Sequence, residues 1–257
     1  MSTPSRPRSP SRLCSALRLA GLGCALALTG CVATAWSRGV LSAGNQTTRA
    51  ADGLLEGTRS LPPFGEGYRI YSVLGNALGR QYAHHAVIET LESALAGLHE
   101  REQRRHELAE LGLRHGGLFF PHATHQEGLS VDVMTPMRDR HDHTPARLST
   151  APWALFGYCW HIDPESHRLS GLRWDVRSGA RVCPDVSFSS DKEVDFASLA
   201  SLIEALDSEA RARGGAIAFV IVDPSFVDPL REAGVRVRLS TRAWIAHDDH
   251  VHVEFRF

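Results

Sequence analysis

Two histidine-rich segments constrain this chain of 257 residues more than any other feature. The first, HATHQEGLSVD, spans residues 122–132, and the second, HDDHVH, spans residues 247–252. Side chains two residues apart point to the same face of a strand, so we expect His250 and His252 on one face of a C-terminal strand. Gly128 permits a tight turn, which lets His125 and Asp132 converge.

These side chains predict a metal site. Histidine and aspartate supply the nitrogen and oxygen ligands of zinc, and three protein ligands leave one position of a tetrahedral ion open, as in hydrolytic sites. His250 and His252 can both bind one metal, or one can bind it while the other transfers protons. Each histidine taken alone is more typical of a surface or core position than of a ligand.

The hydrophobic pattern predicts an α+β fold, because helices and strands alternate without a regular βαβ repeat. We expect a loop over residues 136–150 and a hairpin or irregular β insertion over 153–162 and 171–177. The expected helices cover residues 83–112, 195–213 and 226–233, and the expected strands cover 68–74, 117–120, 129–134, 216–222 and the end of 242–257.

The two segments together resemble the penicillin-insensitive murein endopeptidases. This family belongs to a wider (LAS-type) metallopeptidase group with lysostaphin-type and D-Ala-D-Ala carboxypeptidase-type enzymes. The segment Gly79-Arg80-Gln81-Tyr82, with His85, also resembles the family. The positions in register with the family pattern are His122, His125, Gln126, Gly128, Leu129, Asp132, His247, His250 and His252.

The resemblance implies a small central antiparallel sheet with flanking helices that carries a zinc site. His125, Asp132 and His252 would bind Zn²⁺. His250 would act as general base or stabilise the oxyanion, with His247 beside it in the catalytic group, and His122 would line the site. The implied activity is hydrolysis of the peptide cross-links between D-alanine and a diamino acid in bacterial peptidoglycan.

The chain departs from the family at several positions. Pro121 replaces a glycine, and Ser130 replaces an aspartate two residues before Asp132. An accessory metal would use His122, with His161, Asp163 and His167 as the nearest substitutes for the missing downstream ligands. Asp249 stands where the carboxypeptidase relatives place a catalytic glutamate, so a D,D- or L,D-carboxypeptidase with Asp249 as base stays open. Asp248 and Asp249 would otherwise orient imidazoles. A non-catalytic peptidoglycan-binding lipoprotein is the second alternative.

The N-terminus predicts export. Residues 1–30 hold four arginines and no acid, and the apolar run over 19–28 is too short to span a membrane. Leu28-Thr29-Gly30-Cys31 resembles the bacterial lipobox, whose cysteine is acylated; the alternative is an ordinary signal peptide with a chance cysteine. We therefore predict a lipoprotein signal peptide over 1–30, lipidation at Cys31, a flexible tether over 31–63 and the catalytic domain over 64–257.

Location and remaining partners follow from the same features. A lipid anchor would hold the protein to a membrane in the periplasm, and Val32, standing where an inner-membrane retention aspartate would be, favours the outer membrane. The net charge of −1 gives no electrostatic basis for a nucleic-acid partner. Cys159 and Cys183 would remain after export, and an oxidising compartment favours a disulfide between them over two free thiols or metal ligands.

Overall fold

The computed structural model describes residues 57–117, 119, 124–148, 159–172, 186–243 and 246–257. The predicted signal peptide, Cys31, His122 and Cys183 lie outside these residues. Within the described part no helix is both long enough and apolar enough to cross a membrane.

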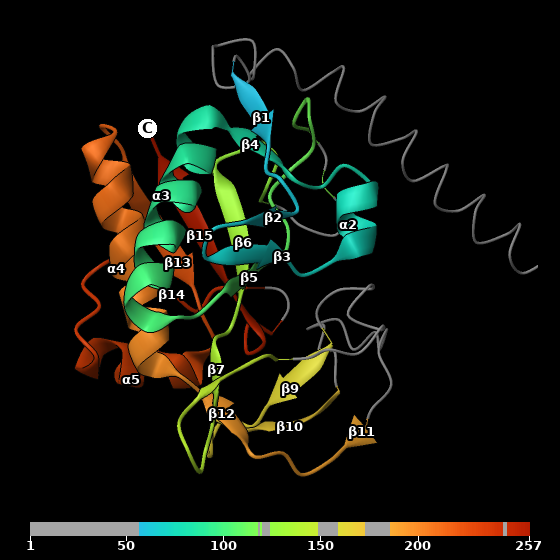
Figure 1. Ribbon diagram of the computed structural model, residues 1–257, viewed down its shortest axis with the longest axis vertical. Helices are drawn as coiled ribbons and strands as arrows, with labels where there is room; N and C mark the ends of the chain where they lie inside the picture. The colour runs from blue at the N-terminus through green and yellow to red at the C-terminus, as the bar shows by residue number, and fades with distance from the viewer. Residues whose placement is uncertain (1–56, 118, 120–123, 149–158, 173–185, 244–245) are drawn as a thin grey trace, which may run out of the picture.

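The largest sheet is mixed rather than purely antiparallel. Its strands run in the order β14-β13-β15-β6-β5-β3-β2 (Figure 1). The middle pairs are antiparallel, whereas β3 pairs with β5, and β13 with β14, in parallel. The α+β class is confirmed, but the expected small antiparallel sheet is wrong at its margins. The strands are β2 (Phe64–Gly65), β3 (Tyr68–Ile70), β5 (His106–Leu108), β6 (Ser130–Met134), β13 (Ala216–Ile221), β14 (Leu239–Ser240) and β15 (His250–Arg256).

Two long helices, α3 (His85–Glu102) and α4 (Phe196–Ala212), lie side by side against one face of this sheet (Figure 1). Val133 on β6 and Val251 on β15 are fully buried and belong to the same hydrophobic core as the helices. Because side chains alternate along a strand, Asp132 and His252 point to the opposite face. The short helices are α2 (Val73–Ala77), the 3-10 turn η2 (Pro224–Phe226) and α5 (Val227–Glu232).

The helix expected over 83–112 is wrong in its last third. It ends at Glu102 because Gln103 adopts a left-handed conformation, with φ of 53°. Residues 106–108 instead form β5, which pairs with β3. The apolar spacing continues past Gln103, but sheet pairing overrides it.

Three smaller sheets complete the fold. Strand β1 lies inside the predicted tether and pairs with β4, so the folded part begins before residue 64. The expected loop over 136–150 contains the hairpin of β7 and β8. The insertion forms a β11-β10-β9 sheet. The bounds are β1 (Thr58–Ser60), β4 (Tyr82–His84), β7 (Met137–Asp139), β8 (Pro145–Ala146), β9 (Trp160–Ile162), β10 (Leu169–Leu172), β11 (Val186–Ser187) and β12 (Lys192–Val194), which pairs with β7.

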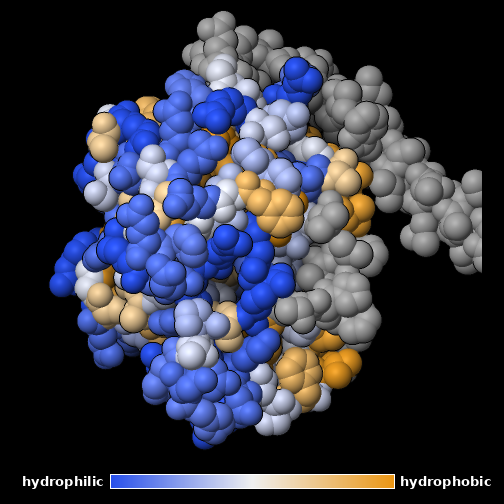
Figure 2. All heavy atoms as spheres, viewed as in Figure 1, coloured by the Kyte–Doolittle hydropathy of each residue, from blue (hydrophilic) through white to orange (hydrophobic). Residues whose placement is uncertain are grey.

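The face shown in Figure 2 is mainly hydrophilic, with hydrophobic groups over β2, α2 and β11. Exposed large hydrophobic residues in those elements and next to them are Phe64, Leu74, Val186 and Phe188.

Candidate metal centre

The pairing of β6 with β15 brings two of the predicted ligands together. In the antiparallel register His252 stands directly opposite Asp132. Directly opposed side chains on one face of a sheet are near neighbours. His252 Nδ1 lies 2.8 Å from Asp132 Oδ1, and both residues are buried. The period-two pattern predicts the shared face, and the register supplies the contact.

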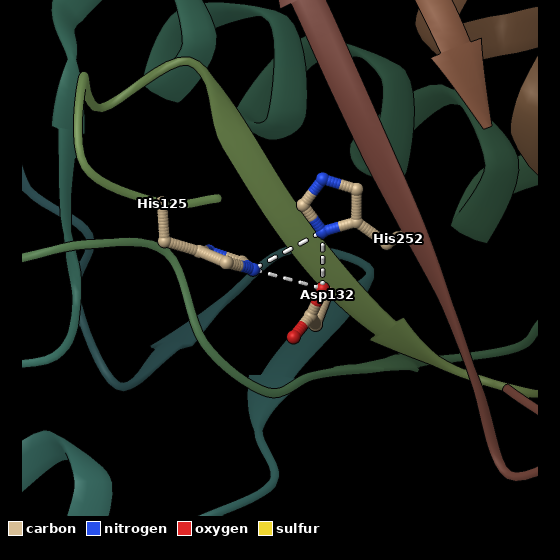
Figure 3. Close-up of side chains that lie close together, drawn as sticks. All are labelled: His125, Asp132 and His252. Atoms are coloured by element: carbon tan, nitrogen blue, oxygen red, sulfur yellow. Dashed lines mark hydrogen bonds and ion pairs between the residues drawn. The ribbon is translucent and has the colours of Figure 1, made fainter. Parts of the chain in front are cut away.

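The third ligand, His125, reaches this pair from the turn before β6 (Figure 3). Its Nε2 lies 3.1 Å from Asp132 Oδ1 and 3.1 Å from His252 Nδ1. The ligand atoms of the three side chains all lie within 4.8 Å of one another. They form the one group of three or more potential metal ligands found among the described residues. His125 has φ of +65°, a strained conformation for this residue that is typical of functional sites.

The outer hydrogen bonds of both imidazoles suit a metal. His125 Nδ1 contacts the Leu111 carbonyl, which only accepts, so the proton sits on Nδ1 and the Nε2 lone pair faces inward. Glu254 Oε2 lies 3.3 Å from His252 Nε2 and likewise leaves the Nδ1 lone pair facing inward. With both inner nitrogens deprotonated, two lone pairs and the Asp132 carboxylate would converge on one point and repel one another. A cation at that point resolves the repulsion, so the donor set fits a divalent metal.

The pKa shifts of Asp132 and His252 show that the cluster favours a positive charge next to the carboxylate. Burial raises the pKa of Asp132, but the charges and hydrogen bonds of His125 and His252 outweigh it and hold that pKa well below its ordinary value. Burial lowers the pKa of His252, but hydrogen bonds to Asp132 and Glu254 raise it to about 9. The metal-free cluster therefore holds a proton where a metal would compete with it.

Sequence reasoning missed Glu254 and the role of Ser130. Ser130 Oγ donates to Glu254 Oε2 and accepts the His125 backbone N–H at 3.3 Å. The residue that departs from the family pattern therefore links the His125 turn to the carboxylate behind His252. Glu254 lies two residues after His252 on the same strand, and this spacing was a signal that could have found it.

The Gly79–Tyr82 segment contacts the two residues, Leu111 and Phe119, that pack against the His125 ring. The Leu111 N–H donates to the Arg80 carbonyl at 3.1 Å, which fixes the segment after β5 whose Leu111 carbonyl contacts the His125 ring. The Arg80 guanidinium lies 4.0 Å from the Phe119 ring centroid, and Phe119 stacks on His125 with ring centroids 5.2 Å apart. Arg80, which belongs to the segment that resembles the family, therefore contacts the residues that hold the predicted ligand His125.

His250 and Asp249 form a second buried pair beside the cluster. His250 Nδ1 lies 2.7 Å from Asp249 Oδ1, and Asp249 Oδ2 accepts the Trp160 backbone N–H at 3.0 Å. The His247 ring lies 4.4 Å from the His250 ring, centroid to centroid. Burial and the neighbouring Asp248 raise the pKa of Asp249 well above its ordinary value. The contact with His250 is compatible with the interpretation that Asp249 orients an imidazole, which stays a prediction.

The candidate accessory metal ligands His161, Asp163 and His167 each contact a different partner. His161 Nδ1 lies 3.0 Å from Asp248 Oδ2, which also accepts the Ile162 N–H at 2.9 Å. Asp163 accepts from Ser166 within its own turn. His167 Nε2 contacts the Ser225 carbonyl at 3.2 Å. These side chains form no metal-binding group in the described part of the chain.

Only one cysteine of the predicted disulfide, Cys159, lies among the described residues. Cys159 is disulfide-bonded. Cys183 lies outside the described residues, so its pairing with Cys159 stays a prediction.

Fold and site together define an α+β protein with a buried candidate metal centre of two histidines and an aspartate. The family model described as penicillin-insensitive murein endopeptidase matches residues 47–157. This match includes His125 and Asp132, stops before β15, and confirms the predicted resemblance to that family. The match supports a peptidase, and the described family acts on murein, the peptidoglycan of the cell wall. No curated protein matches the chain.

Proposed function

We propose that the protein is a zinc metalloendopeptidase that cleaves the D-alanine to diamino acid cross-links of peptidoglycan. The observation that carries the proposal is the convergence of His125 Nε2, Asp132 Oδ1 and His252 Nδ1 within 4.8 Å. Two imidazole nitrogens and one carboxylate are a ligand set that catalytic zinc sites use, and they leave a position for substrate. The family match supplies the substrate class.

The residues around the three ligands would transfer the proton, orient the imidazole rings and fix their tautomers. A bound zinc would supply a Lewis acid that polarises the scissile carbonyl and lowers the pKa of a water. His250 would accept and return the proton at Nε2, the nitrogen that does not contact Asp249. Asp249 would keep the ring oriented. Glu254 and the Leu111 carbonyl keep the ligand imidazoles in the tautomers that face inward.

The contacts of Asp249 favour His250 as the base over Asp249. Both Asp249 carboxylate oxygens are engaged, one by His250 and the other by the Trp160 N–H. A carboxylate held in this way is suited to positioning. The carboxypeptidase alternative, with Asp249 as base, is therefore retained only as an outcome of the experiment below.

The test uses zinc-loaded protein and purified peptidoglycan, with and without a chelator, and measures muropeptide masses. We expect chelator-sensitive conversion of cross-linked dimers to monomers. The His252→Ala variant should lose zinc and activity, whereas His141→Ala, a change at an exposed histidine with one surface ion pair, should lose neither. Release of only a terminal D-alanine would identify a carboxypeptidase. Zinc binding with intact peptidoglycan would instead identify a binding protein.

We also propose that the protein is exported to the periplasm and anchored by lipid at Cys31. The support is the basic, acid-free N-terminus and the Leu-Thr-Gly-Cys sequence. The anchor would place the site next to peptidoglycan. In cells, Cys31→Ala should move the protein from the membrane fraction to the soluble fraction, and an unchanged distribution would contradict lipidation.

A further inference from the structure

A polar cavity lies beside the β5 and β6 ends and is lined mainly by cationic side chains. The space between these side chains is about 260 Å³, a volume that includes open solvent. The recess itself is far smaller than a small-molecule pocket and admits one small chemical group rather than a whole ligand. The charged and imidazole side chains that line it are Arg69, Arg104, Arg105, His106, Glu107 and Arg147.

The cavity has more positive charge than its acids balance. Glu107 is the one carboxylate that lines it, and it pairs with both Arg69 and Arg147, at 2.9 and 2.8 Å. Arg104 pairs with Asp195, outside the lining, at 2.5 Å. Four guanidinium groups therefore face two carboxylates, which leaves two positive charges. Arg105 is exposed and makes no hydrogen bond or ion pair within the described residues.

His106 forms part of the cavity wall as a buried ring. The residue is only 3% exposed, and its Nε2 is buried away from the open space, without a hydrogen-bond partner in the described part of the chain. Burial and the charge of Arg104 lower the pKa of His106 to about 3, so the ring is neutral. The neutral ring therefore adds no further charge to those of the arginines.

The cavity shares a wall with the candidate catalytic loop. Thr135 lines the cavity, its N–H donates to the Asp249 carbonyl, and its hydroxyl donates to the Asp248 carbonyl, both at 2.9 Å. Met134, which also lines it, stands opposite His250 in the β6–β15 register. A group bound in the cavity would therefore sit next to the segment that carries His250.

We propose that this cavity binds a free carboxylate of the peptide that the metal centre hydrolyses. The inference rests on the proposed function, because wall peptides carry free carboxylates in addition to the bond that is cleaved. A planar carboxylate matches the forked guanidinium groups of arginine. Binding it would neutralise excess charge in the cavity.

A direct binding experiment tests the site without catalysis. The probe is N-acetyl-D-alanine, compared with its uncharged amide, titrated by calorimetry into the metal-free full-length chain so that zinc cannot capture the anion. We expect the carboxylate to bind at least about tenfold more tightly than the amide, because charge-assisted hydrogen bonds contribute strongly. Inorganic phosphate should displace it. Equal binding of acid and amide would overturn the proposal.

Two variants and a matched control locate the binding. Arg105→Gln removes one of the unbalanced charges and breaks no contact in the described structure, and Arg147→Gln leaves Glu107 paired with Arg69. Each should weaken carboxylate binding about tenfold or more. Arg211→Gln removes the same charge from the exposed side of α4 and should change nothing. Equal binding by all three variants would overturn the proposal.

Kinetics separate this site from the proposed function. With zinc-loaded protein, Arg105→Gln should raise KM for a cross-linked peptide about tenfold at nearly constant kcat, and amidation of the peptide carboxylates should have the same effect on wild type. An unchanged KM for both would overturn the carboxylate site while hydrolysis itself stands. Selective carboxylate binding by a protein that leaves peptidoglycan intact would sink the proposed function and leave an anion site.

Discussion

Glu254 acts on His252 as the Leu111 carbonyl acts on His125. Each would hold a ring proton on the nitrogen that faces away from a bound metal and so leave the inner nitrogen to that metal. The two partners differ in one respect, because Glu254 is charged and would make His252 a stronger ligand. Such outer partners commonly change metal affinity by one to two orders of magnitude.

We expect Glu254→Gln to weaken zinc binding about tenfold or more without unfolding the protein. The amide loses the negative charge and can present the wrong group to His252 Nε2 and Ser130 Oγ. Competition with a chromophoric chelator gives the dissociation constant. Glu100→Gln, on the exposed side of α3, is the matched control. An unchanged dissociation constant would show that Glu254 does not set the tautomer.

Zinc affinity should rise with pH up to about 9. His252 has a pKa raised to about 9 in the metal-free protein, so binding zinc below that pH must displace its proton. Each pH unit below 9 should cost about tenfold in affinity for this one proton. Titrations between pH 6 and pH 10 measure the slope, and a flat profile below pH 9 would contradict the protonated state.

The raised pKa of His252 also makes the folding stability of the metal-free protein depend on pH. Since the folded-state pKa of His252 lies above its ordinary value of 6.5, its contribution to stability is complete below about pH 6.5 and is lost as pH rises through about 9. Chemical unfolding of chelated protein should show stability falling across this window. The His252→Ala variant should lack that part of the decline.

His250→Ala should lower kcat by about 10² or more and leave zinc bound, since general acid–base residues typically contribute that much. His250 hydrogen-bonds Asp249 and lies outside the three-ligand group. Its loss therefore removes proton transfer rather than the metal. Peptidoglycan turnover and zinc content measured on one preparation separate the two, and loss of zinc would reassign His250 as a ligand.

At the scale of the elements, the turn at Gly128 sets the approach of His125 to β6. Gly128 has φ of +70°, and a Cβ there would lie 3.2 Å from the His84 backbone nitrogen. Gly214 has φ of +81° with no atom within 4 Å of such a Cβ. Substitutions at Gly128 and Gly214 therefore distinguish the effect of backbone strain from the effect of steric crowding.

We expect Gly214→Ala to cost about 1–2 kcal/mol of stability from the left-handed conformation alone. Gly128→Ala should cost more, because the turn must also move away from β4. It should also weaken zinc binding by displacing His125. Urea unfolding and zinc titration of both variants test this. Equal effects of the two variants on zinc affinity would contradict a positioning role for the turn.

Period-two spacing was enough to predict that His250 and His252 share a face, and helical spacing predicted α4 almost to the residue. Both are local patterns. The sequence did not predict the end of α3 at Glu102 or the formation of β5, because pairing with β3 depends on distant residues. The β6–β15 register, which places His252 opposite Asp132, is equally non-local. Family resemblance supplied the ligand assignment that spacing alone left open.

At the scale of the whole molecule, one buried ion pair joins three elements. Arg104 follows α3, and its guanidinium contacts Asp195 at 2.5 Å and the Met137 carbonyl on β7 at 2.8 Å. Asp195 also caps α4 by accepting the Ser198 N–H at 3.1 Å. The start of α4, the end of α3 and β7 are therefore fixed to one another at this point.

Asp195→Ala should destabilise the protein by about 3–5 kcal/mol, since it leaves Arg104 buried without its charge partner and removes a helix cap. Asp191→Ala, at an exposed position with longer ion pairs, should change stability by less than about 1 kcal/mol. Equilibrium unfolding in urea compares them. Similar small losses for both would show that Arg104 finds another partner.

Asp248 and Asp249 connect the β9 insertion to the segment that carries His250. Each accepts a backbone N–H from β9, at Ile162 and Trp160, and Asp249 also contacts His250. Detaching β9 would leave two neighbouring buried carboxyl groups without those donors. Linkage then works in both directions, so a substrate that orders His250 must also tighten the insertion by the same free energy. The insertion would therefore become more protected from hydrogen exchange when the site, some 90 residues away in the chain, is filled.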